Sequence, residues 1–263
     1  MNRQTAKSAL ERIDKVLLDR GFVKSRQQAQ ALILEGSVLV NEHRIDKPGT
    51  RVDVSSPIRL KHLPPPYVSR GGLKLERALD LFVLDIRGWT CLDIGASTGG
   101  FTDCLLQRGA TKVYALDVGH NQLDWKLRSD RRVIVIEGLN ARYVKFEDIG
   151  ETVDLITLDL SFISLTLVLP VLKPFEKAAT KIICLIKPQF EVGKGQVEKG
   201  GLVTDPSKHE QVVQKIRSAA EALEYRIEGL VESPILGADG NREFLMGLGR
   251  RTLPMEAREE LNA

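Results

Sequence analysis

Short, continuous apolar runs recur along most of this chain and alternate with segments that have helical spacing. Seven such runs cover residues 89–94, 112–116, 133–136, 154–158, 181–186, 227–231 and 243–247. Helical spacing is clearest over residues 70–82, 101–108 and 208–223. Continuous apolar runs are typical of strands buried on both faces, and the alternation with helices indicates a parallel sheet. We therefore predict an α/β domain with a doubly wound, mostly parallel seven-stranded sheet.

The first sixty residues follow a different pattern. Ile13, Val16 and Leu17 have helical spacing, and Ser25 starts a capping box that opens a second helix ending near Gly36. Short strands at 38–40 and 51–54 follow, with a turn at 41–44. This pattern predicts a small α+β domain over residues 1–61, a proline-rich linker at 62–69, a large domain at 70–250 and a charged tail at 251–263.

Charge is concentrated at the N-terminal end. Residues 1–75 contain fourteen Lys or Arg and seven Asp or Glu, although the whole chain has a net charge of only +3. A basic region on a faintly acidic remainder predicts binding to a polyanion such as nucleic acid. A solvated charged surface is the alternative that this excess alone leaves open.

Several protein classes are disfavoured. No apolar run reaches the ~18–20 residues that a membrane span requires, and residues 1–12 lack the apolar segment of a signal peptide. We therefore expect a cytoplasmic protein that does not enter membranes. Cys91, Cys104 and Cys184 form no C-x-x-C pair, and the four histidines are scattered. Reduced, buried thiols and the absence of a metal site are the expectation.

A glycine-rich loop follows the first apolar run of the large domain. Strand, glycine turn and helix form the entrance of nucleotide sites in α/β sheets. The dinucleotide pattern G-x-G-x-x-G has glycine where Ser97 stands here, so the loop instead resembles the first motif of S-adenosylmethionine (AdoMet) methyltransferases. The candidate cofactor residues are Asp93, Gly95, Ala96, Ser97, Gly99, Gly100, Phe101, Asp117 and Asn140.

Three of these candidates have separate expected roles. Asp117 ends the second strand, where an acid can accept both ribose hydroxyls of an adenosine, although an N-cap or turn role is the alternative. Asn140 follows the third strand and could face the adenine. Asp93 fits a role in fixing the loop, or a water-mediated bond to the methionyl amine, better than a reactive one.

Four charged residues stand beside apolar strands or near the start of the large domain: Lys74, Asp159, Lys187 and Glu243. An ion at the end of a buried strand is costly unless it is paired or faces a cleft. Two amines and two carboxylates that converge could activate a weak nucleophile such as a ribose 2′-hydroxyl, which needs a positioned base for in-line attack on a methyl group. Ordinary surface ion pairs are the alternative for each residue taken alone.

These motifs together resemble known families. Residues 12–17, 25–29 and 35–41 are similar to the ribosomal S4-type RNA-binding domain, and residues 67–74, 93–101, 159–164, 187–194 and 240–243 resemble the TlyA family of rRNA cytidine 2′-O-methyltransferases, many of which are called hemolysins. The resemblance implies a Rossmann-like class I AdoMet-dependent methyltransferase fold of the FtsJ type, no metal, and rRNA or ribosomal subunits as partners.

The resemblance also implies residue roles. Lys187 is the expected base, Asp159 tunes it, and Lys74 with Glu243 orients the ribose. The implied RNA contacts are Arg12, Lys15, Lys24, Arg26, Arg44 and Lys194. Two other functions stay open: a membrane-active cytolysin, and a ribosome-assembly factor that binds RNA without catalysis. A pseudouridine synthase is disfavoured because the large domain contains the glycine loop.

Overall fold

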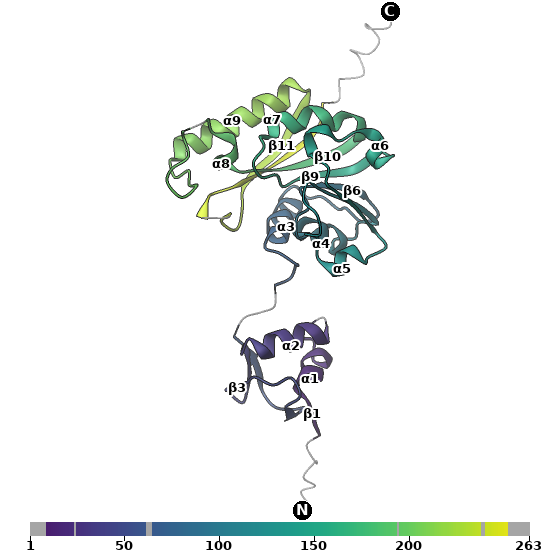
Figure 1. Cartoon of the computed structure of the whole chain (residues 1–263), viewed down its shortest axis with the longest axis vertical. Coiled ribbons are helices and arrows are strands. Elements are labelled where there is room, and N and C mark those ends of the chain that lie inside the picture. Colours follow the sequence, from purple (N-terminus) through teal and green to yellow (C-terminus); the bar gives the residue numbers. More distant parts are fainter. Residues whose placement is uncertain (1–8, 24, 62–64, 194, 238–239, 252–263) are drawn as a thin grey trace, which may run out of the picture. The chain divides into compact units, whose positions relative to one another are not determined.

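The chain divides into two compact units, residues 1–65 and 66–263, which we call the N-terminal unit and the C-terminal unit (Figure 1). The computed structural model describes residues 9–23, 25–61, 65–193, 195–237 and 240–251. The predicted charged tail lies outside these residues from residue 252 onward.

Two helices pack on small sheets in the N-terminal unit. Its elements are β1 (Leu10–Arg12), α1 (Ile13–Asp19), α2 (Arg26–Leu34), β2 (Val38–Val40), β3 (His43–Ile45), β4 (Arg51–Asp53) and β5 (Ile58–Leu60). Strand β2 lies between β3 and β5, and β1 pairs with β4. Ile13, Val16 and Leu17 are buried as their spacing predicts, and Ser25 Oγ caps α2 by accepting from the amide of Gln28 at 3.2 Å.

The turn after β2 is shorter than predicted. Asn41 and Glu42 both have positive φ, as in a two-residue hairpin turn, so His43 already begins β3. Strands β1 and β5 were not predicted. Each has three residues, which is too short to establish a repeating pattern, and neither contains a fully buried side chain.

A seven-stranded sheet forms the centre of the C-terminal unit. In chain order its strands are β6 (Thr90–Ile94), β7 (Lys112–Asp117), β8 (Val133–Glu137), β9 (Val153–Leu158), β10 (Glu176–Ile186), β11 (Tyr225–Glu232) and β12 (Phe244–Arg250). They lie in the order β11-β12-β10-β9-β6-β7-β8, and β12 runs antiparallel to both of its neighbours. All seven predicted runs are strands, so the predicted mostly parallel sheet is confirmed.

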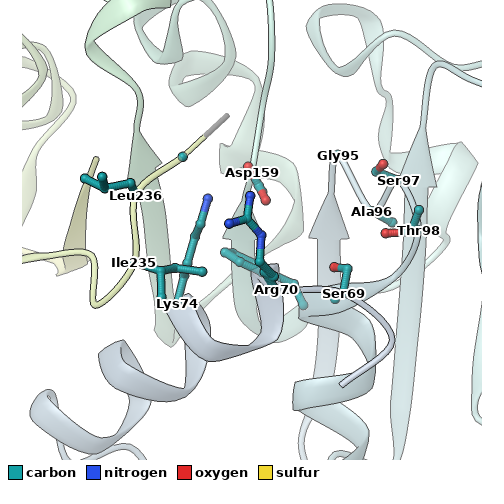
Figure 2. A pocket seen from close by; sticks show the side chains of 14 residues that line it. Ser69, Arg70, Lys74, Gly95, Ala96, Ser97, Thr98, Asp159, Ile235 and Leu236 are labelled. Atoms are coloured by element: carbon teal, nitrogen blue, oxygen red, sulfur yellow. The ribbon is translucent and has the colours of Figure 1, made fainter. Parts of the chain in front are cut away.

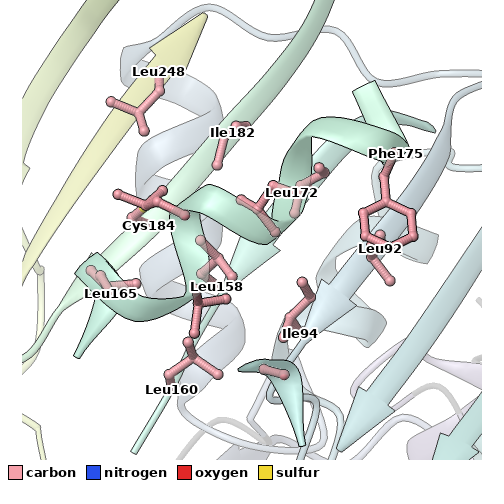
Figure 3. Close-up of a cluster of buried hydrophobic side chains, with 14 of the residues drawn as sticks. Leu92, Ile94, Leu158, Leu160, Leu165, Leu172, Phe175, Ile182, Cys184 and Leu248 are labelled. Atoms are coloured by element: carbon pink, nitrogen blue, oxygen red, sulfur yellow. The ribbon is translucent and has the colours of Figure 1, made fainter. Parts of the chain in front are cut away.

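Helices cover both faces of this sheet (Figure 1). The longer ones are α3 (Gly71–Leu81), α4 (Gly100–Gln107) and α9 (Pro206–Ala222); the short ones are α5 (Trp125–Arg128), η1 (Ala141–Tyr143), α6 (Phe146–Ile149), α7 (Leu165–Val168), η2 (Leu169–Phe175) and α8 (Pro188–Glu191). Successive strand residues point to opposite faces. Leu92 and Ile94 therefore join the core under η2 and α9 (Figure 3), whereas Cys91 joins the core under α3 and α4.

The chain changes direction across the sheet at β6. From β6 it proceeds outward to β7 and β8, and it then returns to the other side of β6 as β9. In open α/β sheets, ligands bind beyond the carboxyl ends of the strands at such a switch point. The loops after β6 and β9 are therefore where a ligand is expected.

Candidate functional site

The glycine loop after β6 lies directly against the loop after β9. Gly95 has a φ of +87°, and a Cβ added there would overlap the carbonyl oxygen of Asp159. Gly100, at the start of α4, is similarly crowded, because a Cβ added there would overlap Ser69 Oγ. Glycine at these two positions lets three chain segments converge at the switch point.

Two cavities open at this point. The first cavity has a volume of about 360 Å³ and lies between the start of α3, the glycine loop and residues 235–237 (Figure 2). The second cavity, of about 490 Å³, lies between the glycine loop and the residues after β7, β8 and β9. Gly95, Ser97 and Asp159 line both, so the two cavities meet beneath the glycine loop. Their volumes are in the range typical of small-molecule sites.

The second cavity contains polar groups suited to a nucleoside. The carboxylate of Asp117 accepts from the amides of Ser97 at 2.8 Å and Gly119 at 2.7 Å, which fixes its orientation at the end of β7. Asn140 also lines this cavity, and its Oδ1 accepts from the amide of Arg142 at 3.0 Å. The predicted ribose and adenine residues therefore lie in one cavity.

Asp93 lies outside both linings. Its carboxylate is fully buried and accepts from the hydroxyls of Thr102 at 2.7 Å and Thr157 at 2.9 Å. Burial raises the pKa of Asp93 to about 7, although both hydroxyls favour the charged form. The two hydrogen bonds of Asp93 thus connect β6 to α4 and β9. Gly99 also lies outside the linings of both cavities, and it caps the N-terminus of α4 in a left-handed conformation. The remaining cofactor candidates, Gly95, Ala96, Ser97, Gly100 and Phe101, line the first cavity.

The four predicted catalytic residues form two ion pairs. Lys187 Nζ lies 2.6 Å from Asp159 Oδ1 and donates to Ser161 Oγ at 3.1 Å. Lys74 Nζ lies 2.5 Å from Glu243 Oε2, and both of these side chains are buried. Lys74 and Asp159 line the first cavity, so each pair contributes one member to its wall.

The topology of the sheet explains why Glu243 reaches this edge. Parallel strands β9 and β10 end beside each other, and Asp159 and Lys187 follow them directly. Strand β12 is antiparallel to β10, with Phe244 opposite Ile186. The residue that precedes β12 therefore lies at the same edge as the residues that follow β9 and β10.

Four residues of the site were not predicted to belong to it. Ser69, Arg70 and Thr98 line the first cavity, although only the motifs around them were recognised. Phe162 lines the second cavity with 90% of its surface exposed and a φ of +65°, and its ring lies 4.9 Å from that of Phe190. No sequence signal indicates the exposure or the positive φ of Phe162, because an aromatic residue that follows Leu160 and Ser161 would be expected in the core.

Trp125 does not belong to the core of the C-terminal unit. Its side chain is 76% exposed and lies outside both cavities. Trp125 begins the four-residue helix α5, which is too short for its apolar face to be read from spacing.

The predicted RNA-contact residues of the N-terminal unit differ in how they are held. Arg12 and Arg26 both donate to the buried carboxylate of Asp14, at 2.9–3.0 Å and 3.1 Å, while about half of each arginine side chain stays exposed. The bond from Arg12 is the main reason why the pKa of Asp14 lies well below its usual range. Lys15 pairs with Glu11 at 2.7 Å. Arg44 is exposed and lies over Gly36. Lys24 and Lys194 fall outside the described residues.

Among the described residues, no helix is long and apolar enough to cross a membrane, and no cluster of three or more metal-ligating side chains occurs. Cys91, Cys104 and Cys184 are free and buried, as predicted.

Known proteins share this sequence and fold. Residues 67–250 match the FtsJ-like methyltransferase family, and residues 11–58 match the S4 domain. A 16S/23S rRNA (cytidine-2′-O)-methyltransferase TlyA from Mycobacterium tuberculosis is 46% identical over 242 residues, which cover 92% of this chain and 90% of that protein. Hemolysin A of Brachyspira hyodysenteriae is 41% identical over 89% of this chain and 98% of its own length. A solved hemolysin-type structure from Streptococcus thermophilus has a TM-score of 0.69, with 41% identity over 96% of this chain and 94% of its own.

Proposed function

Because this chain belongs to the FtsJ-like methyltransferase family and carries an S4 domain, we propose that it methylates the ribose 2′-hydroxyl of a cytidine in rRNA, with AdoMet as the methyl donor. The observation that carries this proposal is the Lys187–Asp159 ion pair at the point where the two cavities meet. The similarity to the Mycobacterium tuberculosis rRNA methyltransferase supports the substrate class. We also propose the domain limits 1–61, 70–250 and 251–263, with a linker at 62–69.

The two cavities fit AdoMet. Asp117 would accept the ribose hydroxyls of its adenosine in the second cavity, and Asn140 lies where the adenine edge would be. Gly95, Ala96, Ser97, Gly100 and Phe101 would surround the methionine part. When bound, AdoMet supplies a methyl group on a positively charged sulfur, which is open to in-line attack.

In this proposal, Lys187 is the general base. Before attack, the ammonium of Lys187 releases its proton to solvent, and the resulting amine takes the proton of the 2′-hydroxyl as that oxygen bonds to the methyl carbon and the carbon–sulfur bond breaks. Asp159, 2.6 Å away, holds Nζ in place and stabilises the ammonium that results. Lys74 and Glu243 form a second, neutral pair that would orient the ribose without adding net charge.

Phe162 offers a surface for the target base. An exposed aromatic ring in a strained backbone conformation is costly, and such strain concentrates at functional sites. Phe190 supports the ring from one side, so the other side is available for stacking. A nucleotide stacked on this ring would lie beside the adenosine of AdoMet, with its ribose near Ser161 and Asp159.

In the same proposal, the N-terminal unit binds the RNA backbone. Arg12 and Arg26 are fixed by Asp14 yet remain exposed, so their guanidinium groups can bind phosphates. Lys15 and Arg44 would add further contacts, and Lys24 and Lys194 stay predicted contacts. Ribosomal subunits are the proposed partner, and their location makes the cytoplasm the expected site of the reaction.

Radiolabelled AdoMet and isolated ribosomal subunits provide the direct test. We expect label to enter rRNA and to map to the ribose of a single cytidine, with incorporation slower by about a hundredfold or more in Lys187→Ala. Label in protein, in a base, or in no product would contradict the proposal. A protein that assembles ribosomes without catalysis would bind subunits but transfer no methyl group.

A further inference from the structure

Arg70 is a cation of the first cavity that has no partner within the described part of the chain. It lies directly before α3, its side chain is exposed, and it points into the cavity on the side of Asp159 (Figure 2). No hydrogen bond or ion pair joins its side chain to any described residue, although its backbone carbonyl accepts from the amide of Leu73. Arginine is always charged and presents a fork of donors, so an unpaired one at a cavity wall is suited to an oxyanion.

The other basic residue in the cavity linings is already paired. Arg70 and Lys74 are the basic residues among those described that line either cavity. Lys74 is held by Glu243, and Asp159 is held by Lys187. Among the described residues, Arg70 is therefore the lining cation that remains available to an anionic group of a ligand.

The backbone around Arg70 is held tightly against the glycine loop. Ser69 packs on Gly100, where α4 begins. On the other side, a Cβ added at Gly71 would lie 3.6 Å from the ring of Phe101 and 3.8 Å from Asp159 Oδ2. The base of the Arg70 side chain is thus fixed beside the loop that would surround the methionine part of AdoMet.

We propose that Arg70 binds the α-carboxylate of AdoMet, an inference that rests on the proposed function. With the adenosine in the second cavity, the rest of the molecule extends past Gly95 and Ser97, which line both cavities, into the first. The carboxylate is the one anionic group of AdoMet, and Arg70 is the unpaired cation at that end. A guanidinium–carboxylate contact here fixes the methionine tail and leaves Lys187 and Asp159 for the acceptor hydroxyl.

Decarboxylated AdoMet, which lacks only this carboxylate, provides a specific probe. Calorimetry would compare AdoMet with the decarboxylated compound on the wild-type full chain, Arg70→Ala and Arg70→Lys. Arg77→Ala is the matched control, because Arg77 is exposed, lies two turns further along the same helix and lines neither cavity. It removes the same charge without touching the site.

We expect Arg70→Ala to weaken AdoMet binding by about tenfold or more, the usual loss for a charge-assisted contact. Binding of the decarboxylated compound should be the same in wild type and Arg70→Ala, Arg70→Lys should be intermediate for AdoMet, and Arg77→Ala should match wild type.

Equal preference for AdoMet over the decarboxylated compound in wild type and Arg70→Ala would overturn the inference. So would an unchanged AdoMet affinity with a raised KM for ribosomal subunits, which would assign Arg70 to an RNA phosphate. A wild-type protein that binds AdoMet but methylates no ribose would refute the proposed function and leave the role of Arg70 intact. Failure of the wild type to bind AdoMet would overturn both.

Discussion

Lys187 Nζ lies 2.6 Å from Asp159 Oδ1, although 28 positions separate the two residues in sequence. The contact follows from the sheet, because β9 and β10 are parallel neighbours with Leu158 opposite Cys184. Both strands therefore deliver their next residues to the same edge. Two side chains placed by rigid strands keep their geometry better than two placed by loops, which suits a proton transfer.

Replacement of Lys187 should separate base chemistry from charge. Lys187→Ala should lower methyl transfer by about a hundredfold or more, the usual contribution of a general base. Lys187→Arg should be as inactive, because a guanidinium retains the charge opposite Asp159 but does not release its proton at neutral pH. Single-turnover rates with labelled AdoMet would measure the loss, and calorimetry should show AdoMet affinity close to that of wild type.

Near-normal turnover in Lys187→Arg would contradict the assigned base. The cytolysin alternative predicts a different result. If wild type and Lys187→Ala lysed cells to the same extent without AdoMet, methyl transfer would not be the main activity of this protein.

Phe162→Gly should impair binding or turnover of ribosomal subunits while leaving the thermal stability of the protein nearly unchanged. Loss of the ring should raise the KM for ribosomal subunits or lower kcat by roughly ten- to a hundredfold, if stacking is worth about 1–3 kcal/mol. Glycine adopts positive φ without strain, which should offset the lost contact with Phe190, so thermal stability should barely change.

Phe162→Tyr should restore turnover, and Val83→Ala is the surface control, because Val83 is 87% exposed and lines neither cavity of the site. Wild-type kinetics in Phe162→Gly would show that the exposed ring has no role in binding the substrate.

Arg12→Gln combined with Arg26→Gln should weaken binding of rRNA fragments without altering AdoMet affinity. Each lost phosphate contact should reduce the slope of log K against log salt by about one, so the pair should reduce it by about two. Glutamine retains a donor for the buried carboxylate of Asp14, which limits unfolding. Arg59→Gln serves as the control, because Arg59 is an exposed arginine paired with Glu42 in the same unit. An unchanged salt slope in the double variant would exclude these arginines as phosphate contacts.

Asp93 should make the C-terminal unit less stable as the pH rises. Its folded pKa of about 7 lies above the unfolded value of about 3.8, so the folded state holds the proton that the unfolded state has lost. Between about pH 4 and 7, this group should cost the wild type on the order of 1.4 kcal/mol of unfolding free energy per pH unit. Asp93→Asn does not titrate, so its stability relative to wild type should rise across that window.

Fluorescence during urea unfolding reports this difference, because both tryptophans, Trp89 and Trp125, lie in the C-terminal unit. Parallel pH profiles for the two proteins would show that Asp93 is already ionised in the folded state.

The sequence was sufficient for the sheet and for the residues at its edge. Strands such as residues 181–186 are continuous apolar runs because both faces are buried, and their ends are marked by charged residues such as Lys187. The edge position of Glu243 could be guessed only from the family resemblance, since the antiparallel direction of β12 is a tertiary property.

Properties that depend on the environment of a side chain could not be predicted. The exposure of Phe162 follows from a left-handed backbone, and nothing in its neighbours requires that conformation. Arg12 and Arg26 were predicted as RNA contacts, but the sequence did not indicate that one carboxylate fixes both, because the burial of Asp14 is visible only in the structure. Arg70 was overlooked for the same reason, because only the structure shows that its side chain has no partner among the described residues.

The three buried thiols have a practical use. Burial raises the pKa of Cys104 to about 12 and raises the pKa of Cys91 and Cys184 as well, so none forms the reactive thiolate near neutral pH. A cysteine introduced on an exposed helix of each unit would then take maleimide dyes selectively in the otherwise native protein. Energy transfer between two such dyes would report whether the distance between the N-terminal unit and the C-terminal unit changes when ribosomal subunits are added.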